Sequence, residues 1–243
     1  LPLLNERGGE TNIACGWHAI EFLLWGQDFN ETGPGQRPFT DYTDSAPNHE
    51  RRARYLKEAT ALLCQHLQLV KEAWAKKKGS YRETFIKSPD ASVEKLLTGL
   101  TILAGFEISG ERLAVPFETG DQEDEHSCFS DTTHDDFIDN VRGIAAVYRG
   151  GLDRKSGDAQ NGLRALARAA APEVTDLFEQ QLATLETEVR GLPAPFDQTL
   201  RAPAGSAPKK AMERLLNAAE DLAQTLVQLG KSLGYTIPLR PGE

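Results

Sequence analysis

The stretch MERLLNAAEDLAQTLVQLGKSL, residues 212–233, places apolar side chains at the spacing of an α-helix. Its leucines recur at steps of seven, four, three and four residues, which brings them to one side of a helix. The opposite side is mainly charged and polar. We therefore predict an amphipathic helix over about 207–233 whose buried stripe consists of Leu215, Leu222, Leu226, Leu229 and Leu233.

Helical patterns of the same kind continue outward from this stretch and cover most of the chain. No segment alternates apolar and polar residues convincingly with the period of a β-strand. The sequence therefore predicts an all-α fold, a bundle of long helices with decorated connections. The further helices are expected over about 12–24 (capped by Thr11 or Asn12), 49–77, 90–113, 132–149 (capped by Asp131 or Thr132) and 172–191.

Two predicted helices and one loop carry further expectations. The helix over 49–77 has an apolar stripe, and the helix over 90–113 is almost continuously apolar in its middle, which suggests a central position. Glycines at 99, 105 and 110 indicate close packing or a break in that helix. Residues 26–48 form a long Gly- and Pro-rich loop, of a length that usually serves a site. The stripe of the 49–77 helix consists of Leu56, Leu63, Leu67, Val70 and Trp74.

Composition limits the classes of function. The 243-residue chain has a net charge of −9, which argues against a nucleic-acid partner, because phosphate binding relies on clustered Lys and Arg. The basic runs 49–54 and 71–78 are interpreted as solvated helix faces. The longest apolar runs, such as IEFLLW (20–25), are too short to cross a bilayer. The chain begins with Leu, so a leader sequence is neither seen nor excluded.

Three cysteines, Cys15, Cys64 and Cys128, show no CxxC or zinc-finger spacing. A disulfide or a thiol ligand is conceivable for Cys15 and Cys128, since each lies beside a polar motif. Small buried thiols are the interpretation we favour. Their redox state stays open at this point.

The segment GWHAIEFLLWGQD, residues 16–28, carries one histidine and one glutamate in an apolar helix. His18 and Glu21 are three residues apart, so both side chains leave the helix on nearly the same face. The pair can share a cation, or Glu21 can accept the imidazole N–H and orient His18. It can also be a hydrogen-bonded pair with a purely structural role.

A metal site would need ligands from elsewhere in the chain. The zinc-peptidase motifs HExxH and HxxEH are absent, since Phe22 follows Glu21. The run EHSCFSDTTHDD (125–136) offers several donors in a short space, although it also reads as a capped loop with exposed histidines. The candidate completing residues are His126, Ser127, Ser130, Asp131, His134 and Asp135.

Four collinear blocks resemble one protein family. They are NERGGETNIACGWHAIEFLLWGQD (5–28), GPGQRPFTDY (33–42), ERRARYL (50–56) and HSCFSDTTHDDF (126–137). Together they resemble the imelysin family, also called insulin-cleaving membrane protease-like or iron-regulated protein A-like. The blocks lie within about the first 60% of the chain, and the later helical stripes are compatible with the family.

The resemblance implies an all-α fold of two helical-bundle halves with a GxHxxE site near their junction. It also implies a cell-envelope protein, periplasmic or lipid-anchored, that is associated with iron uptake. Gly16, His18 and Glu21 match the GxHxxE positions. His126, Ser130 and Asp131 fall in the second block (126–137), and Arg37 and Asp41 in the loop block, where they can orient or complete the site.

The resemblance also bears on domain organisation and partners. We expect residues 1–243 to form one imelysin-like region, with the GxHxxE helix and site loop in 1–45 and a helical bundle in 46–243. Family members carry a further helical region of about a hundred residues before the motif, about the size of a small bundle. We therefore expect that segment, or another envelope protein, as a partner.

Three functions follow from these observations. The first is an envelope protein of iron acquisition that binds a metal ion (iron, zinc or calcium) or a metal-bearing ligand through His18 and Glu21. The second is a metallopeptidase in which a metal-held water attacks a peptide, with Glu21 as base. The third is an envelope protein-interaction module without metal, in which the pair is structural.

Overall fold

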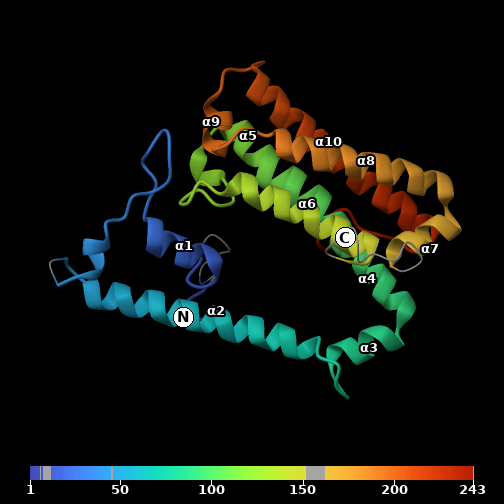
Figure 1. Ribbon diagram of the computed structural model, residues 1–243, viewed down its shortest axis with the longest axis horizontal. Helices are drawn as coiled ribbons and strands as arrows, with labels where there is room; N and C mark the ends of the chain where they lie inside the picture. Colours follow the sequence, from blue (N-terminus) through green and yellow to red (C-terminus); the bar gives the residue numbers. More distant parts are fainter. Residues whose placement is uncertain (6, 8–11, 45, 152–161, 243) are drawn as a thin grey trace. The chain divides into compact units, whose positions relative to one another are not determined.

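The computed structural model describes residues 1–5, 7, 12–44, 46–151 and 162–242. Over these residues the chain is helical and contains no β-strand, which confirms the all-α prediction (Figure 1). The longer helices are α1 (Trp17–Trp25), α2 (His49–Ala73), α4 (Pro89–Thr101), η2 (Ile102–Ala114), α6 (Thr133–Arg149), α7 (Leu163–Ala170), α8 (Pro172–Gly191) and α10 (Ala207–Ser232). Shorter ones are η1 (Phe39–Tyr42), α3 (Tyr81–Lys87), α5 (Val115–Thr119), η3 (Gln122–Asp124) and α9 (Phe196–Arg201).

The chain forms two compact units. Unit 1 comprises Leu1–Lys87 and Ser127–Asp131, and unit 2 comprises Ser88–His126 and Thr132–Glu243. The second sequence block, 126–137, therefore contributes to both units. This division differs from the 1–45 and 46–243 segments expected from the sequence, which stay a prediction.

Unit 2 is built around α10. This helix packs against α8, η2 and α4, and α6 packs against α8 (Figure 1). The predicted stripe is confirmed, because four of its leucines are buried and Leu233 packs against them. Aromatic rings of other helices complete this core, among them Phe137, Tyr148, Phe178 and Phe196.

The helix predicted over 90–113 is continuous across its glycines but changes its winding. It runs as α4 and then as a π-helix, η2. At Gly105 an added Cβ would lie 2.9 Å from the Cβ of Ala223 on α10, which no ordinary contact permits. Close packing is therefore confirmed at Gly105, because the two helix backbones approach there. Gly99 has open space instead, so it serves no such contact.

Unit 1 departs from two expectations. The first helix begins at Trp17 and not near residue 12, because Gly16 has φ = +91°, a conformation that interrupts a helix. Thr11 lies outside the described residues. The predicted stripe of α2 is not buried: Leu67, Val70 and Trp74 are exposed, and Ala59 is the buried residue of this helix. The periodicity was right for a helix, but it did not predict burial.

The cysteines are unbridged, and they differ in exposure. Cys128 is buried, as expected, and Cys15 is half-buried. Cys64 is exposed on α2, so the expectation of a buried thiol is wrong there. The reason is the same as for the apolar stripe, since α2 buries little of its surface.

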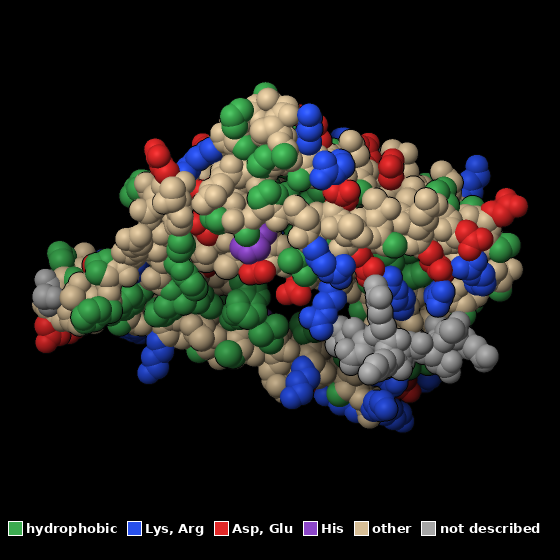
Figure 2. Space-filling view, turned by 45° about the horizontal axis from the view of Figure 1, so that its top comes forward, with side chains coloured by type: hydrophobic (Ala, Val, Ile, Leu, Met, Phe, Trp, Pro, Cys, Tyr) green, Lys and Arg blue, Asp and Glu red, His purple; other side chains and the backbone are tan. Residues whose placement is uncertain are grey.

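The surface has mixed charge. On the face shown in Figure 2, basic and acidic side chains are interspersed and form no broad field of one sign. Over the described residues, no helix combines the length and the apolarity that crossing a membrane requires.

Candidate functional site

The GxHxxE segment begins with a backbone conformation that only glycine adopts easily. Gly16 has φ = +91° and ψ = −167° at the N-cap of α1, a region that is strongly unfavourable for residues with a Cβ. The helix then starts at Trp17, which places His18 in its first turn and Glu21 one turn later. The glycine of the motif is thus explained by geometry.

His18 and Glu21 are joined by a hydrogen bond. The Nδ1 atom of His18 lies 2.8 Å from Oε2 of Glu21. The imidazole is 39% exposed, whereas the glutamate side chain is 10% exposed. The two residues therefore share one helix face, as their spacing predicted, with the carboxylate beneath the ring and the ring toward the surface.

Ser130 holds the other oxygen of this carboxylate. Oε1 of Glu21 accepts the backbone N–H of Ser130 at 2.9 Å and its hydroxyl at 2.7 Å. Both residues belong to unit 1, although they are 109 positions apart in the chain. With two donors on Oε1 and the imidazole on Oε2, the carboxylate is fixed in one orientation. Ser130, a predicted site residue, is therefore a direct partner of the GxHxxE glutamate.

The segment that carries Ser130 is fixed to the site loop. The backbone N–H of Gly35 donates to the carbonyl of Phe129 at 2.9 Å, and the Phe129 ring packs edge-to-face on Phe22 at 5.0 Å. Gly35 has no room for a side chain, because a Cβ would lie 2.7 Å from the carbonyl oxygen of Trp25. The glycine-rich loop thus brings two distant segments together by backbone contact.

Asp131, the next residue, is buried and has φ = +56°. Asp tolerates this left-handed conformation better than most residues with a side chain. The chain turns here before α6 begins at Thr133, with Thr132 at its N-cap. Asp131 therefore shapes the turn between Ser130 and α6.

Arg37 and Asp41 lie beside the C-terminal end of α1. Nη1 of Arg37 donates to Oδ2 of Asp41 at 3.0 Å, and Nη2 donates to the carbonyl of Phe22 at 3.3 Å. The guanidinium also lies over the Phe22 ring, 5.4 Å from its centroid. Arg37 thus caps a helix C-terminus, where a cation is favoured by the exposed carbonyls.

The predicted histidines of the second block belong to unit 2. Nδ1 of His126 lies 2.8 Å from Oδ2 of Asp136. His134, in the first turn of α6, has Nε2 3.7 Å from Oδ2 of Asp135. The predicted set is thus divided, since Ser130 meets Glu21 inside unit 1 whereas His126 has a carboxylate partner within unit 2.

Sequence reasoning missed the residues that anchor the turn before the motif. Oδ1 of Asn5 accepts the backbone N–H groups of Ala14 and Cys15, at 2.9 and 3.2 Å. The hydroxyl of Tyr55, on α2, donates to the carbonyl of Ala14 at 2.7 Å, and burial raises the pKa of that phenol. Both residues lie in blocks quoted for the resemblance, which was the available signal.

The described part of the chain brings no three His, Cys, Asp or Glu side chains close enough together to hold a metal ion. It offers one imidazole, positioned by a carboxylate that is itself positioned by a serine. Arrays of this kind are typical of histidines that ligate a metal, because the carboxylate fixes the ring and raises its basicity. The donor set fits a metal centre that takes one protein ligand here.

The helical fold of the described residues and the GxHxxE motif on α1 together indicate the class of this protein. The sequence profile of the family described as Imelysin matches residues 3–229, and the chain belongs to the imelysin family. The resemblance noted in the sequence is therefore confirmed.

Two similar proteins have related names. The chain is 26% identical over 222 residues to "Iron-regulated protein A" of Synechococcus elongatus, an alignment that covers 87% of this chain and 57% of that protein. A crystal structure of a protein assigned as an iron-regulated protein A precursor, from Parabacteroides distasonis, has the same fold, with a TM-score of 0.71 at 19% identity. That match covers 92% of this chain and 65% of the other. The chain thus spans about three-fifths of these relatives.

Proposed function

We propose that this chain is part of a cell-envelope protein of iron acquisition, and that His18 binds the metal of an iron-bearing ligand. Membership in the imelysin family and similarity to a protein named for its iron regulation support the proposal. The location that we propose, in the periplasm or on a lipid anchor, is inferred from the family resemblance. The observation that carries the proposal is the array of His18, Glu21 and Ser130.

The hydrogen bond to Glu21 determines which ring nitrogen of His18 can act as a metal ligand. An ionised carboxylate only accepts hydrogen bonds, so the proton of a neutral His18 sits on Nδ1, facing Oε2. The lone pair is then on Nε2, at the opposite side of the ring. A neutral imidazole nitrogen suits Fe(II), Zn(II) or Cu(II), and it also binds the iron of chelates. Glu21 is therefore a positioning residue and His18 the ligand.

One imidazole favours a metal that brings most of its own ligands. A bare Ca(II) takes six to eight oxygen ligands, and a structural zinc takes four protein ligands. The array supplies one such ligand, because both oxygens of Glu21 already accept hydrogen bonds. An iron chelate with an open coordination position meets this condition, and the bound iron would accept electron density from the imidazole.

Hemin, an iron chelate with open axial positions, is a suitable probe because ligation shifts its absorption band. We expect the chain to bind hemin with a shifted band and His18→Ala to lose at least tenfold in affinity. His66→Ala is the matched control, since His66 is exposed on α2 in the same unit. Titration with Fe(II), Fe(III), Zn(II) and Ca(II) alone should show weaker binding than hemin.

Glu21→Gln tests the role of the carboxylate. The backbone N–H of Ser130 needs an acceptor at the Oε1 position, so the amide NH2 of the glutamine must face Nδ1 of His18. The imidazole proton then moves to Nε2, which can no longer ligate. We expect the fold to be kept, hemin affinity to fall as in His18→Ala, and nitrogen NMR shifts to show the exchanged tautomer.

Equal hemin binding by the wild type, His18→Ala and His66→Ala would contradict the proposal. So would binding of none of these metal probes, which would leave the pair structural. Tight binding of a bare ion that also supports peptide hydrolysis would favour the metallopeptidase, which stays a prediction.

A further inference from the structure

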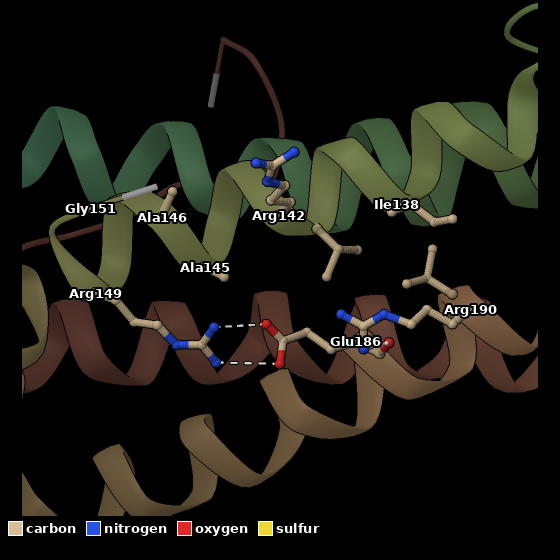
Figure 3. A pocket seen from close by; sticks show the side chains of 10 residues that line it. Ile138, Arg142, Ala145, Ala146, Arg149, Gly151, Glu186 and Arg190 are labelled. Atoms are coloured by element: carbon tan, nitrogen blue, oxygen red, sulfur yellow. Dashed lines mark hydrogen bonds and ion pairs between the residues drawn. The ribbon is translucent and has the colours of Figure 1, made fainter. Parts of the chain in front are cut away.

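A groove in unit 2 has the features of a second binding site. It lies between α6 and α8 and encloses a cavity of about 430 Å³ (Figure 3), a size within the range of small-molecule sites. All its described lining residues belong to unit 2, whereas His18 and Glu21 belong to unit 1. The side chains that decide its chemistry are Ile138, Val141, Arg142, Arg149, Glu186 and Arg190.

Three arginines line the groove against one glutamate. Arg142 and Arg149 come from α6, seven residues apart, and Arg190 comes from the C-terminal end of α8 (Figure 3). The only carboxylate in the described lining belongs to Glu186. The local balance is therefore positive, in a chain whose net charge is −9. A lining of this sign in an acidic protein favours an anionic ligand.

The arginines differ in how their donors are used. Arg149 binds both oxygens of Glu186, at 2.7 and 3.4 Å. Arg190 donates one N–H to the carbonyl of Glu186 at 2.8 Å, out of the five N–H groups of a guanidinium. Arg142 approaches Asp139 at only 3.7 Å, in an exposed pair. Arg149 thus serves the fold, while Arg190 retains donors for a ligand and Arg142 contributes its charge at the rim of the groove.

The walls of the groove are apolar. Val141, Ala145 and Val189 are buried beneath it, and Ile138 is half-buried at one end (Figure 3). An inorganic anion would leave these walls in contact with water, whereas a ligand with an apolar body would cover them. Arg149 and Glu186 already form a two-point contact between a guanidinium and a carboxylate in the groove. The carboxylate of a ligand would bind an arginine in the same way.

We propose that the groove between α6 and α8 binds an amphipathic organic carboxylate, with its head on Arg190, which extends along the groove toward Glu186 (Figure 3), and its apolar body against Val141, Ala145 and Val189. Arg142, at the rim, adds positive charge without touching the head. This site does not depend on metal binding at His18. A guanidinium presents two parallel N–H donors to a carboxylate, which gives the head a defined orientation.

The test uses decanoate as the probe, below its micelle-forming concentration, and decanol as its neutral counterpart. Calorimetric titration of the whole chain should show saturable decanoate binding and at least tenfold weaker decanol binding. Arg190→Gln should weaken decanoate binding at least fivefold, and Arg142→Gln, which removes a charge at the rim, about twofold to threefold. Arg54→Gln is the matched control, because Arg54 is exposed on α2 in unit 1, and it should change the affinity less than twofold.

Ala146→Trp tests the position independently of charge. Ala146 lines the groove from α6 and is half-buried, so an indole there fills the cavity (Figure 3). We expect circular dichroism to show an intact helical fold and decanoate binding to be lost. Equal binding of decanoate and decanol, equal effects of Arg190→Gln and Arg54→Gln, unchanged binding in Ala146→Trp, or no saturable binding would each overturn the proposal.

Discussion

The side chains of Glu21 in unit 1 and Glu186 in unit 2 are both 10% exposed, yet their partners differ in kind. Glu186 is bound at both oxygens by the guanidinium of Arg149. Glu21 accepts a serine hydroxyl, a backbone N–H and an imidazole nitrogen. Of these partners the guanidinium is always charged, whereas the serine hydroxyl and the backbone N–H are neutral donors.

The difference separates a structural carboxylate from one that serves chemistry. The charge of a buried carboxylate bound by arginine is neutralised. The ion pair of Arg149 and Glu186 in addition connects two helices, α6 and α8. A carboxylate held by neutral donors keeps its charge for the imidazole above it, which it orients and polarises. The three predictions below test this distinction, and two concern unit 2, where the stability cost should be larger.

The largest effect is expected for Arg149→Ala. This change removes the guanidinium from a buried carboxylate, and losing one partner of such a pair costs about 3 kcal/mol or more. Urea unfolding followed by circular dichroism measures the loss. Arg142→Ala, seven residues earlier on the same helix and exposed, should cost no more than about 0.5 kcal/mol. Similar losses for the two variants would show that Glu186 does not depend on Arg149.

The second effect concerns Glu179 on α8 and acid stability. Hydrogen bonds from Arg164 and Tyr148 lower the pKa of this carboxyl from 4.5 to about 2, against the opposing effect of burial. Because the folded pKa lies below the unfolded one, the stabilisation is present above pH 4.5 and is lost as the pH falls toward 2. The loss should be roughly 2–3 kcal/mol.

Unfolding free energies measured at pH 5 and at pH 2.5 test this expectation. Glu179→Gln should show a smaller change between these two values than the wild type, because its side chain does not titrate. The same pair of measurements on Glu188→Gln, which removes another arginine-bound carboxylate of α8, provides the control. A wild-type change no larger than that of Glu179→Gln would contradict the assignment.

The smallest effect on stability is expected in unit 1, for Ser130→Ala. The variant removes one donor to Glu21 but keeps the backbone N–H, so the cost should be about 1 kcal/mol. Hemin affinity should fall severalfold, because the carboxylate orients His18 less firmly. Ser232→Ala, exposed on α10, serves as the control. A loss of stability as large as that of Arg149→Ala would place Glu21 with the structural carboxylates.

The apolar stripes of α10 and α2 show where the sequence predicted the fold correctly and where it did not. The leucines of α10 formed a stripe that the structure buries, because other helices of unit 2 pack on it from several sides. The stripe of α2 had a similar period but lies largely exposed. Periodicity reports that a helix has an apolar face, and it contains no information on whether another element covers that face.

The candidate site shows the same limit in a different form. The spacing of His18 and Glu21 predicted their contact, since residues three apart on a helix are neighbours. Ser130 was a candidate among several donors of the second block, and no pattern separated it from His126. The structure separates them, because Ser130 lies in unit 1 beside Glu21 while His126 pairs with Asp136 in unit 2.

The sequence by itself determined the all-α class, most helix positions, the His18–Glu21 pair and the imelysin resemblance, because local spacing and collinear motifs carry these features. Only the tertiary structure decided that Ser130 fixes Glu21 and that arginines from α6 and α8 line one groove. The physical reason is that such contacts join segments far apart in the chain, and their geometry depends on how whole helices pack.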